Sequence, residues 1–406
     1  MSLPFKLPIL LDGATDANEF AVGMPGDACA EKWITEHPEK LLSVQGDYIA
    51  AGARAICAPT FGANGMCLSK FGLEGEVTAL NEKLVALSRQ AANQSGVPVG
   101  GCLSPTGLLV PPLGDADFDD IYDLYREQIR ALHSAGVDFI LIEAQTSLAD
   151  MRAAVLAART TNLPVLLTIA VDENGFTATG AGLLPAVLTL QAMGVDAIGL
   201  SGSLPPPQML PLIEEIAPHL GIAMIAKPSL HTSVQSGAGL LSPSQFTEEM
   251  LPLLRAGAGI VSGCGGMTPK QLKALAAAVK GFAPPEYLQV SDCYAAAIER
   301  EAFFLGDNII FSEPIECTSS LGDDLIDLDD EPVSAALVEI NSLDDVQLLC
   351  ENSMMTRLPI GVRSDQLTVL SAALRYFQGR LIVDSDCQIE IEVIEPLAAK
   401  YGAIVY

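Results

Sequence analysis

Eight short apolar segments, each followed by a segment of helix length, occupy the first two thirds of this chain. The short segments carry apolar residues on both faces, as expected for buried parallel strands. Between them, apolar residues recur at helical spacing, as in Tyr122, Tyr125, Ile129 and Leu132. The predicted strands are Pro8–Gly13, Ala53–Pro59, Pro98–Leu103, Asp138–Ala144, Pro164–Val171, Ala197–Gly202, Ile222–Lys227 and Gly259–Cys264.

A glycine precedes several of these strands, at Gly52, Gly136, Gly194 and Gly257. Glycine can adopt the left-handed conformation that ends a helix, so a strand can begin immediately afterwards. This rhythm is typical of βαβ units with right-handed crossovers. Eight units predict an α/β fold of the (β/α)₈ TIM-barrel type. The alternative is an open doubly wound sheet, whose first strand usually leads into a GxGxxG loop that is absent after Leu11.

The chain of 406 residues is too long for the barrel alone. We expect the barrel at residues 1–285, a helical and acidic linker at 286–332 with a helix over Val290–Leu305, and a small α/β domain at 333–406. That domain is too short for a second barrel, and it should pack on the first or on another subunit of a homo-oligomer. Its predicted strands are Ala336–Ile340, Leu358–Val362, Arg380–Val383 and Ala403–Val405, and its predicted helices are Leu343–Glu351, Gln366–Tyr376 and Ile391–Tyr401.

The composition excludes several classes of partner. A formal net charge of −28 disfavours nucleic acid and anionic membranes, because such surfaces attract basic patches. The apolar runs are shorter than the roughly 18 residues of a membrane span, and the N-terminus does not look like a signal peptide. Nine cysteines without a CxxC pair indicate reduced thiols, so a cytoplasmic location is expected.

Several motifs in the barrel segment resemble the homocysteine S-methyltransferase family. They are Leu11-Asp12-Gly13-Ala14, Ala58-Pro59-Thr60-Phe61-Gly62-Ala63-Asn64, Lys70-Phe71-Gly72-Leu73, Ser104-Pro105-Thr106-Gly107, Leu141-Ile142-Glu143-Ala144 and Phe176-Thr177-Ala178-Thr179-Gly180. The resemblance implies a TIM barrel that methylates the thiol of homocysteine, with roles in methionine biosynthesis and one-carbon metabolism. It also implies a zinc ion held by three cysteines, which binds the substrate thiol as thiolate.

The implied zinc ligands are incomplete here. Gly202 stands at the position of the first family cysteine, Cys264 matches the second, and Gly265 replaces the third. Glycine has no ligating atom, so Zn²⁺ is doubtful unless Cys264 combines with other groups near the same rim. Cys57, Cys102 and His231 are the candidates for such a rearranged set. In the simpler interpretation, Cys57 and Cys102 are small buried apolar residues, and His231 is a loop histidine.

The resemblance also implies substrate contacts. It places Glu143 against the ammonium group of homocysteine and makes Asp12, Thr60 and Asn64 further candidates for substrate binding. In the structural alternative, the carboxylates of Asp12 and Glu143 accept hydrogen bonds from backbone amides. Thr60 and Asn64 would then cap the next helix. Lys227, at the end of the seventh predicted strand, could pair with Glu143 or with an anionic substrate. The apolar run Leu108–Leu113 is either a lid or a surface loop.

Two functions remain open from the sequence. The first is methyl transfer to a thiol acceptor, the thiol amino acid homocysteine. Its donor would be a methylcorrinoid protein, methyltetrahydrofolate or an onium compound. The tail resembles part of a pterin-binding barrel, and no cobalamin motif is present, so a corrinoid would arrive on a separate protein. The alternative is a divergent barrel without zinc or homocysteine chemistry, which binds another small molecule or serves as a partner subunit of a methyl-transfer complex.

Overall fold

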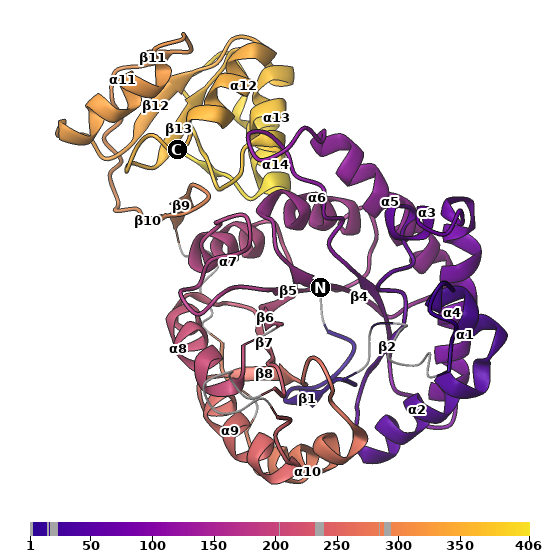
Figure 1. Cartoon of the computed structure of the whole chain (residues 1–406). Coiled ribbons are helices and arrows are strands. Elements are labelled where there is room, and N and C mark those ends of the chain that lie inside the picture. Colours follow the sequence, from indigo (N-terminus) through magenta and orange to yellow (C-terminus); the bar gives the residue numbers. More distant parts are fainter. Residues whose placement is uncertain are drawn as a thin grey trace.

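A computed structural model of the chain describes residues 3–13, 16, 23–202, 204–231, 239–283, 285–287 and 294–406. Its largest sheet has eight strands in the order β1-β8-β7-β6-β5-β4-β3-β2, and a parallel bridge between Leu11 and Ala55 joins the two ends. This arrangement confirms the predicted TIM barrel, seen along its axis in Figure 1. The strands are β1 Ile9–Leu10, β2 Ile56–Ala58, β3 Val99–Leu103, β4 Phe139–Gln145, β5 Val165–Ile169, β6 Ala197–Ser201, β7 Ala223–Lys227 and β8 Ala258–Val261.

An outer layer of helices surrounds the strands (Figure 1). All four junction glycines have positive φ angles, including 79° at Gly136, which ends a helix and directs the chain into β4. Among the described residues, no helix is both long and apolar enough to cross a membrane. The helices are α1 Ala30–Glu36, α2 Pro38–Ala51, α3 Gly65–Ser69, α4 Val77–Ala92, α5 Phe118–Ala135, α6 Leu148–Ala158, α7 Leu183–Ala192, α8 Pro206–Ile216, α9 Pro243–Arg255 and α10 Pro269–Val279.

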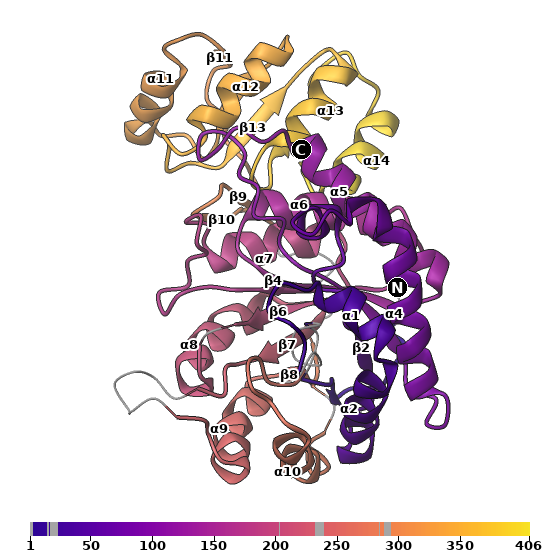
Figure 2. The same ribbon diagram turned by 45° about the vertical axis from the view of Figure 1, so that its right-hand side comes forward.

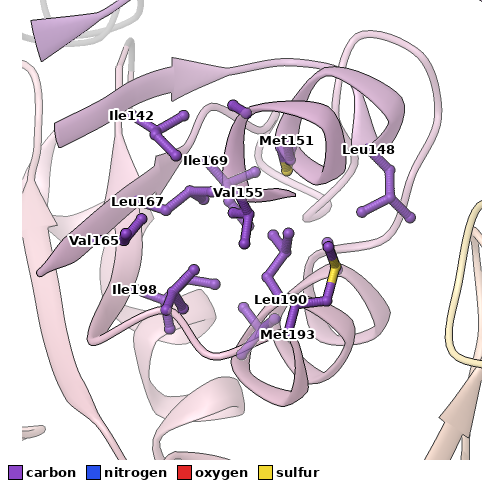
Figure 3. Packing of buried hydrophobic residues seen from close by; sticks show 14 of the residues in the cluster. Ile142, Leu148, Met151, Val155, Val165, Leu167, Ile169, Leu190, Met193 and Ile198 are labelled. Carbon is purple, nitrogen blue, oxygen red and sulfur yellow. The ribbon is translucent and has the colours of Figure 1, made fainter. Parts of the chain in front are cut away.

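The barrel has two separate apolar layers. One fills the space between strands and helices, where Ile142, Leu167 and Ile198 from three neighbouring strands pack against Met151 of α6 and Leu190 of α7 (Figure 3). The other fills the inside of the barrel with side chains that point toward its axis. Strand residues alternate between the two layers with a period of two, and this alternation decides which residues can reach a site inside the barrel.

The C-terminal part contains a second parallel sheet, in the order β11-β12-β13-β14-β15. The predicted strands and helices from residue 335 onward are confirmed within a few residues. Its strands are β11 Ile315–Glu316, β12 Ala336–Glu339, β13 Ile360–Arg363, β14 Ile382–Val383 and β15 Ile404–Val405, and its helices are α11 Leu321–Asp327, α12 Leu343–Asn352, α13 Leu367–Tyr376 and α14 Ile391–Tyr401. Strand β11 belongs to this sheet although it falls within the range predicted as a linker.

The predicted helix over Val290–Leu305 is wrong in the part that the structure describes, and residues 290–293 lie outside that part. Strands β9 Ala295–Ala297 and β10 Ala302–Phe304 form an antiparallel hairpin instead. Ala297 also exchanges two backbone hydrogen bonds with Arg380, of 3.0 and 2.7 Å. The alanine-rich sequence favours a helix locally, but the hairpin and the pairing of Ala297 with the distant Arg380 favour a strand.

The C-terminal part packs against α6 and α7 of the barrel (Figures 1 and 2). Every residue of α6 is buried, which is unusual for an outer helix of a barrel. Its Arg152 reaches across the boundary and donates hydrogen bonds to the carbonyl oxygens of Leu374 (2.7 Å) and Arg375 (3.0 Å). These carbonyls end α13 and have no partner within that helix, so the guanidinium caps the negative end of its dipole.

Asp150, in the first turn of α6, anchors the loop that follows β3. Its carboxylate accepts hydrogen bonds from the backbone nitrogen (3.0 Å) and hydroxyl (2.6 Å) of Thr106. Burial raises the pKa of Asp150 to about 6, although the hydrogen bonds from Thr106 act in the opposite direction. The carboxyl group therefore loses its proton close to neutral pH rather than near its ordinary value of 3.8.

We predict that Asp150→Asn changes how stability depends on pH. Between pH 3.8 and about 6, the folded protein holds a proton on Asp150 that the unfolded chain has lost. Stability from this group is therefore present at low pH and falls by about 3 kcal/mol as pH rises through that window. Relative to wild type, Asp150→Asn should gain about this amount between pH 3.5 and pH 7 in urea unfolding. Asp323→Asn, which removes an exposed carboxylate of the C-terminal part, serves as the control variant.

Candidate functional site

Charged side chains replace the apolar filling of the barrel at the carboxyl ends of its strands. Glu143 follows Leu141 by two residues in β4, and Lys227 follows Ile225 by two in β7. Leu141 and Ile225 point into the barrel. Because strand residues alternate, Glu143 and Lys227 point inward as well. Enzymes with this fold place their chemistry at this end of the barrel.

Glu143 and Lys227 form a buried ion pair, which confirms one of the two partners expected for Lys227. The Lys227 ammonium donates to Oε1 of Glu143, and the side chains are only 4% and 1% exposed for Glu143 and Lys227. Burial alone would lower the pKa of Lys227, but the negative charge of Glu143 outweighs it and the pKa is raised. The pair is therefore ionised at neutral pH, and neither charge faces bulk water.

Cys57 and Cys102 lie beside this pair inside the barrel. The Cys102 thiol donates to Oε2 of Glu143 over 3.1 Å, and both cysteines are fully buried. Burial raises the pKa of both thiols well above the ordinary range, and the Glu143 carboxylate raises the pKa of Cys102 further. Without a metal ion, both groups are therefore neutral thiols at pH 7.

A bulge in β4 positions Glu143. The pairing of β4 with β5 shifts register between Ile142 and Gln145, and Ala144 has a φ angle of 53°, which is rare for a residue other than glycine. The Ala144 nitrogen donates to Oγ1 of Thr168 (3.0 Å), which lies 2.8 Å from Oγ of Ser201. Bulges next to active sites commonly re-aim a side chain. Thr168 and Ser201 were not predicted as site residues, although their inward position at strand ends was an available signal.

The other predicted substrate contacts bond to the protein itself. The Asp12 carboxylate accepts hydrogen bonds from the backbone nitrogen of Cys57, at 3.1 Å to Oδ1 and 3.2 Å to Oδ2. The Thr60 hydroxyl exchanges two bonds of 2.9 Å with the backbone of Cys102 and so ties the loop after β2 to β3. Asn64 caps α3 through the Cys67 nitrogen at 2.8 Å and donates to Oγ of Ser104 at 3.1 Å. The Asp-Gly-Ala segment is described only through Gly13 and again at Asp16.

Cys264 lies on the same rim, just after β8. It is partly buried, and its backbone nitrogen donates to the Pro228 carbonyl oxygen over 2.8 Å, which holds the loop after β8 against the loop after β7. The Cys264 thiol lies close enough to Lys227 to contribute to the raised pKa of its ammonium group. The neighbouring Gly265 has a φ angle of 66°, and a Cβ placed there would lie 3.9 Å from Nδ1 of His231.

These residues do not fit a zinc ion held by three thiolates. Gly202 and Gly265 contribute no ligating atom, and both have positive φ angles. Within the part of the chain that the structure describes, no three His, Cys, Asp or Glu side chains come together as a metal site. His231 is the imidazole next to the position of Gly265, so Cys264 and His231 are the Cys and His donors among the described residues of the loops after β7 and β8.

Comparison with known proteins identifies the barrel. A sequence model of the homocysteine S-methyltransferase family matches residues 9–279, which include all eight strands of the barrel. This chain belongs to the homocysteine S-methyltransferase family.

Relatives of known name are much longer. The methionine synthases of Mycobacterium tuberculosis (strain ATCC 25618 / H37Rv) and Mycobacterium leprae (strain TN) are 26% and 24% identical over 402 and 406 residues. Each alignment covers 88% of this chain and 33% of the relative, so the chain spans about a third of their length. Because the aligned share exceeds the barrel, the C-terminal part also takes part in the similarity.

Solved structures support the fold. The oxidized form of the homocysteine methyltransferase MmuM from Escherichia coli aligns with a TM-score of 0.57 and 21% identity, over 66% of this chain and 95% of MmuM. The metallated form of MmuM aligns with a TM-score of 0.56 and 22% identity, over 66% and 96% of the two chains. Both alignments correspond in extent to the barrel.

Proposed function

We propose that this protein transfers a methyl group to a thiol amino acid of the homocysteine type, without the three-cysteine zinc site of its family. The observation that carries the proposal is the family match across all eight strands. At the carboxyl ends of these strands, Glu143 and Lys227 present one negative and one positive charge inside the barrel. An amino acid carries the complementary ammonium and carboxylate groups, so it can exchange partners with this pair.

In this proposal each site residue has a defined task. Glu143 binds the ammonium of the acceptor, and Lys227, released from Glu143, binds its carboxylate. Asp12, Thr60 and Asn64 hold the loops around the acceptor through the bonds described above. Burial keeps water away and strengthens these charge interactions. The acceptor sulfur attacks the methyl group as a thiolate, its proton passes to solvent, and the bond between donor and methyl breaks.

Three methyl donors are candidates: a methylcorrinoid carried by a separate protein, methyltetrahydrofolate, or an onium compound. We also retain Cys264 as a candidate metal ligand, since it is the matched family position that still has a sulfur atom. The second candidate function is the divergent barrel, a small-molecule-binding or partner subunit. The absence of ligating atoms at Gly202 and Gly265 favours it.

Methyl transfer should be measured with homocysteine and, separately, with 4-mercaptobutanoate, which lacks the ammonium, and 3-mercaptopropylamine, which lacks the carboxylate. Methylcobalamin, methyltetrahydrofolate and a methylsulfonium amino acid would serve as donors. We expect one donor to support turnover. Each truncated thiol should lower kcat/KM by about 30- to 100-fold, which corresponds to the loss of one charge-assisted hydrogen bond of about 2–3 kcal/mol. Equal rates with all three thiols would contradict the roles of Glu143 and Lys227. No turnover with any donor, together with no homocysteine binding in calorimetry, would favour the second candidate.

Zinc content tests the metal site independently of turnover. Protein purified with added zinc should contain far less than one zinc per chain. The double variant G202C/G265C restores the family cysteines and should bind more zinc, even though each positive φ angle costs about 1 kcal/mol for a residue other than glycine. Stoichiometric zinc in wild type that disappears in Cys264→Ala would instead establish Cys264 as a ligand.

A further inference from the structure

The apolar loop Leu108–Leu113 forms one wall of a cavity between the barrel and the C-terminal part. The cavity has a volume of about 750 Å³. Its other walls come from the barrel rim after β4 and β5, the turn between β9 and β10, and helices α12 and α13. In Figure 2 the loop after β3 reaches from the barrel to the C-terminal helices. A volume of this size suits a small organic molecule.

Large apolar side chains face each other across this cavity. Leu109 and Leu113 of the loop are 36% and 55% exposed, and Leu343 and Met354 on the opposite side are 63% and 39% exposed. Exposed leucine and methionine side chains that gather around one hollow are typical of a binding site rather than an ordinary surface. The body of a ligand that covers them must therefore be apolar.

The charged groups around the cavity are mostly acidic. Four carboxylates line it, and among the described lining residues Arg300 is the one lysine or arginine; the carboxylates are Asp115, Asp117, Glu299 and Glu351. The side-chain oxygen of Gln378, also in the wall, has no hydrogen-bond partner, while its nitrogen donates to the Tyr376 carbonyl at 2.7 Å. Negative charge and an unused acceptor favour a cationic donor over an anion.

We propose that this cavity binds a small amphipathic cation, an apolar molecule with one positively charged nitrogen or sulfur group. Neither Glu143 nor Lys227 lines this cavity, and the proposal does not depend on methyl transfer. Because its walls come from the barrel and from the C-terminal part, an occupant contacts both. Binding should therefore raise the unfolding temperature of the whole chain.

Dansylcadaverine, a cationic fluorescent probe, tests the proposal on the full chain. Its anionic counterpart, dansyl-6-aminohexanoate, has the same apolar body. We expect saturable binding of one dansylcadaverine per chain and at least tenfold weaker binding of the anion. The double variant E299Q/E351Q should weaken the cation about tenfold. Gln347→Arg, at an exposed position in the α12 wall, should abolish its binding, whereas Glu395→Gln on α14 should have no effect.

Three results would overturn this assignment. They are the absence of saturable binding, equal affinity for the two probes, and binding that survives in Gln347→Arg. Circular dichroism of each variant confirms that it is folded before its affinity is compared. Since neither probe carries a thiol or a transferable methyl group, failure here leaves the proposed methyl transfer untouched, and failure of methyl transfer leaves this site untouched.

Discussion

Replacing Lys227 with methionine is expected to destabilise the barrel by about 3–5 kcal/mol at neutral pH. Methionine has a similar volume, so little cavity is created. The loss arises because Glu143, whose side chain is 4% exposed, keeps a buried negative charge without its cation. Urea unfolding followed by the fluorescence of Trp33, the one tryptophan of the chain, reports this change in the barrel. At acidic pH the orphaned carboxylate takes up a proton, so the penalty should shrink.

The double variant K227M/E143L separates charge balance from packing. Replacing both partners with apolar residues of similar size removes the buried charges together, and its stability should return to within about 1 kcal/mol of wild type. If Lys227→Met alone leaves the unfolding midpoint unchanged, the ion pair does not contribute as proposed. The double variant should also fail to bind homocysteine, which would show that the pair is retained for binding rather than for stability.

Arg152→Met is expected to weaken the attachment of the C-terminal part by about 2–4 kcal/mol. Burial lowers the pKa of Arg152 to about 10, so the guanidinium is still charged at pH 7 and makes two charge-assisted bonds to α13. Methionine leaves both carbonyl oxygens buried and without a donor. The C-terminal part should therefore unfold before the barrel.

Trp33 fluorescence and circular dichroism together show whether the C-terminal part unfolds before the barrel. Trp33 lies in α1 and reports the barrel, whereas circular dichroism reports both parts. The two urea transitions should coincide in wild type and separate in Arg152→Met, with circular dichroism changing first. Arg126→Met removes an exposed ion pair within α5 and should leave them coincident. Coincident transitions in Arg152→Met would show that other contacts hold the two parts together.

The barrel was predictable from the sequence because its signals are local. Each strand is a short apolar run, and glycines such as Gly136 mark where helices end. The hairpin at Ala295–Ala297 was not predictable, because its strand depends on Arg380, which is distant in sequence. Local preference favours a helix for this alanine-rich segment, and only the folded partner decides otherwise.

Some features of the candidate site could likewise be predicted from the sequence, and others could not. The missing cysteines at Gly202 and Gly265 can be read directly from the motifs, and the pairing of Lys227 with Glu143 was one of two open choices. The bonds that occupy Asp12 and Thr60 were not predictable, because they depend on the register between neighbouring strands. Nor was the left-handed Ala144, since the sequence around it reads as an uninterrupted strand.

The complete burial of α6 has a practical consequence for protein engineering. A fragment that ends near residue 285 would keep every strand of the barrel but would expose the mostly apolar helix α6, in which Arg152 would have lost both acceptors. Such a fragment should be prone to self-association, so a soluble miniature of this protein would require polar substitutions along that stripe.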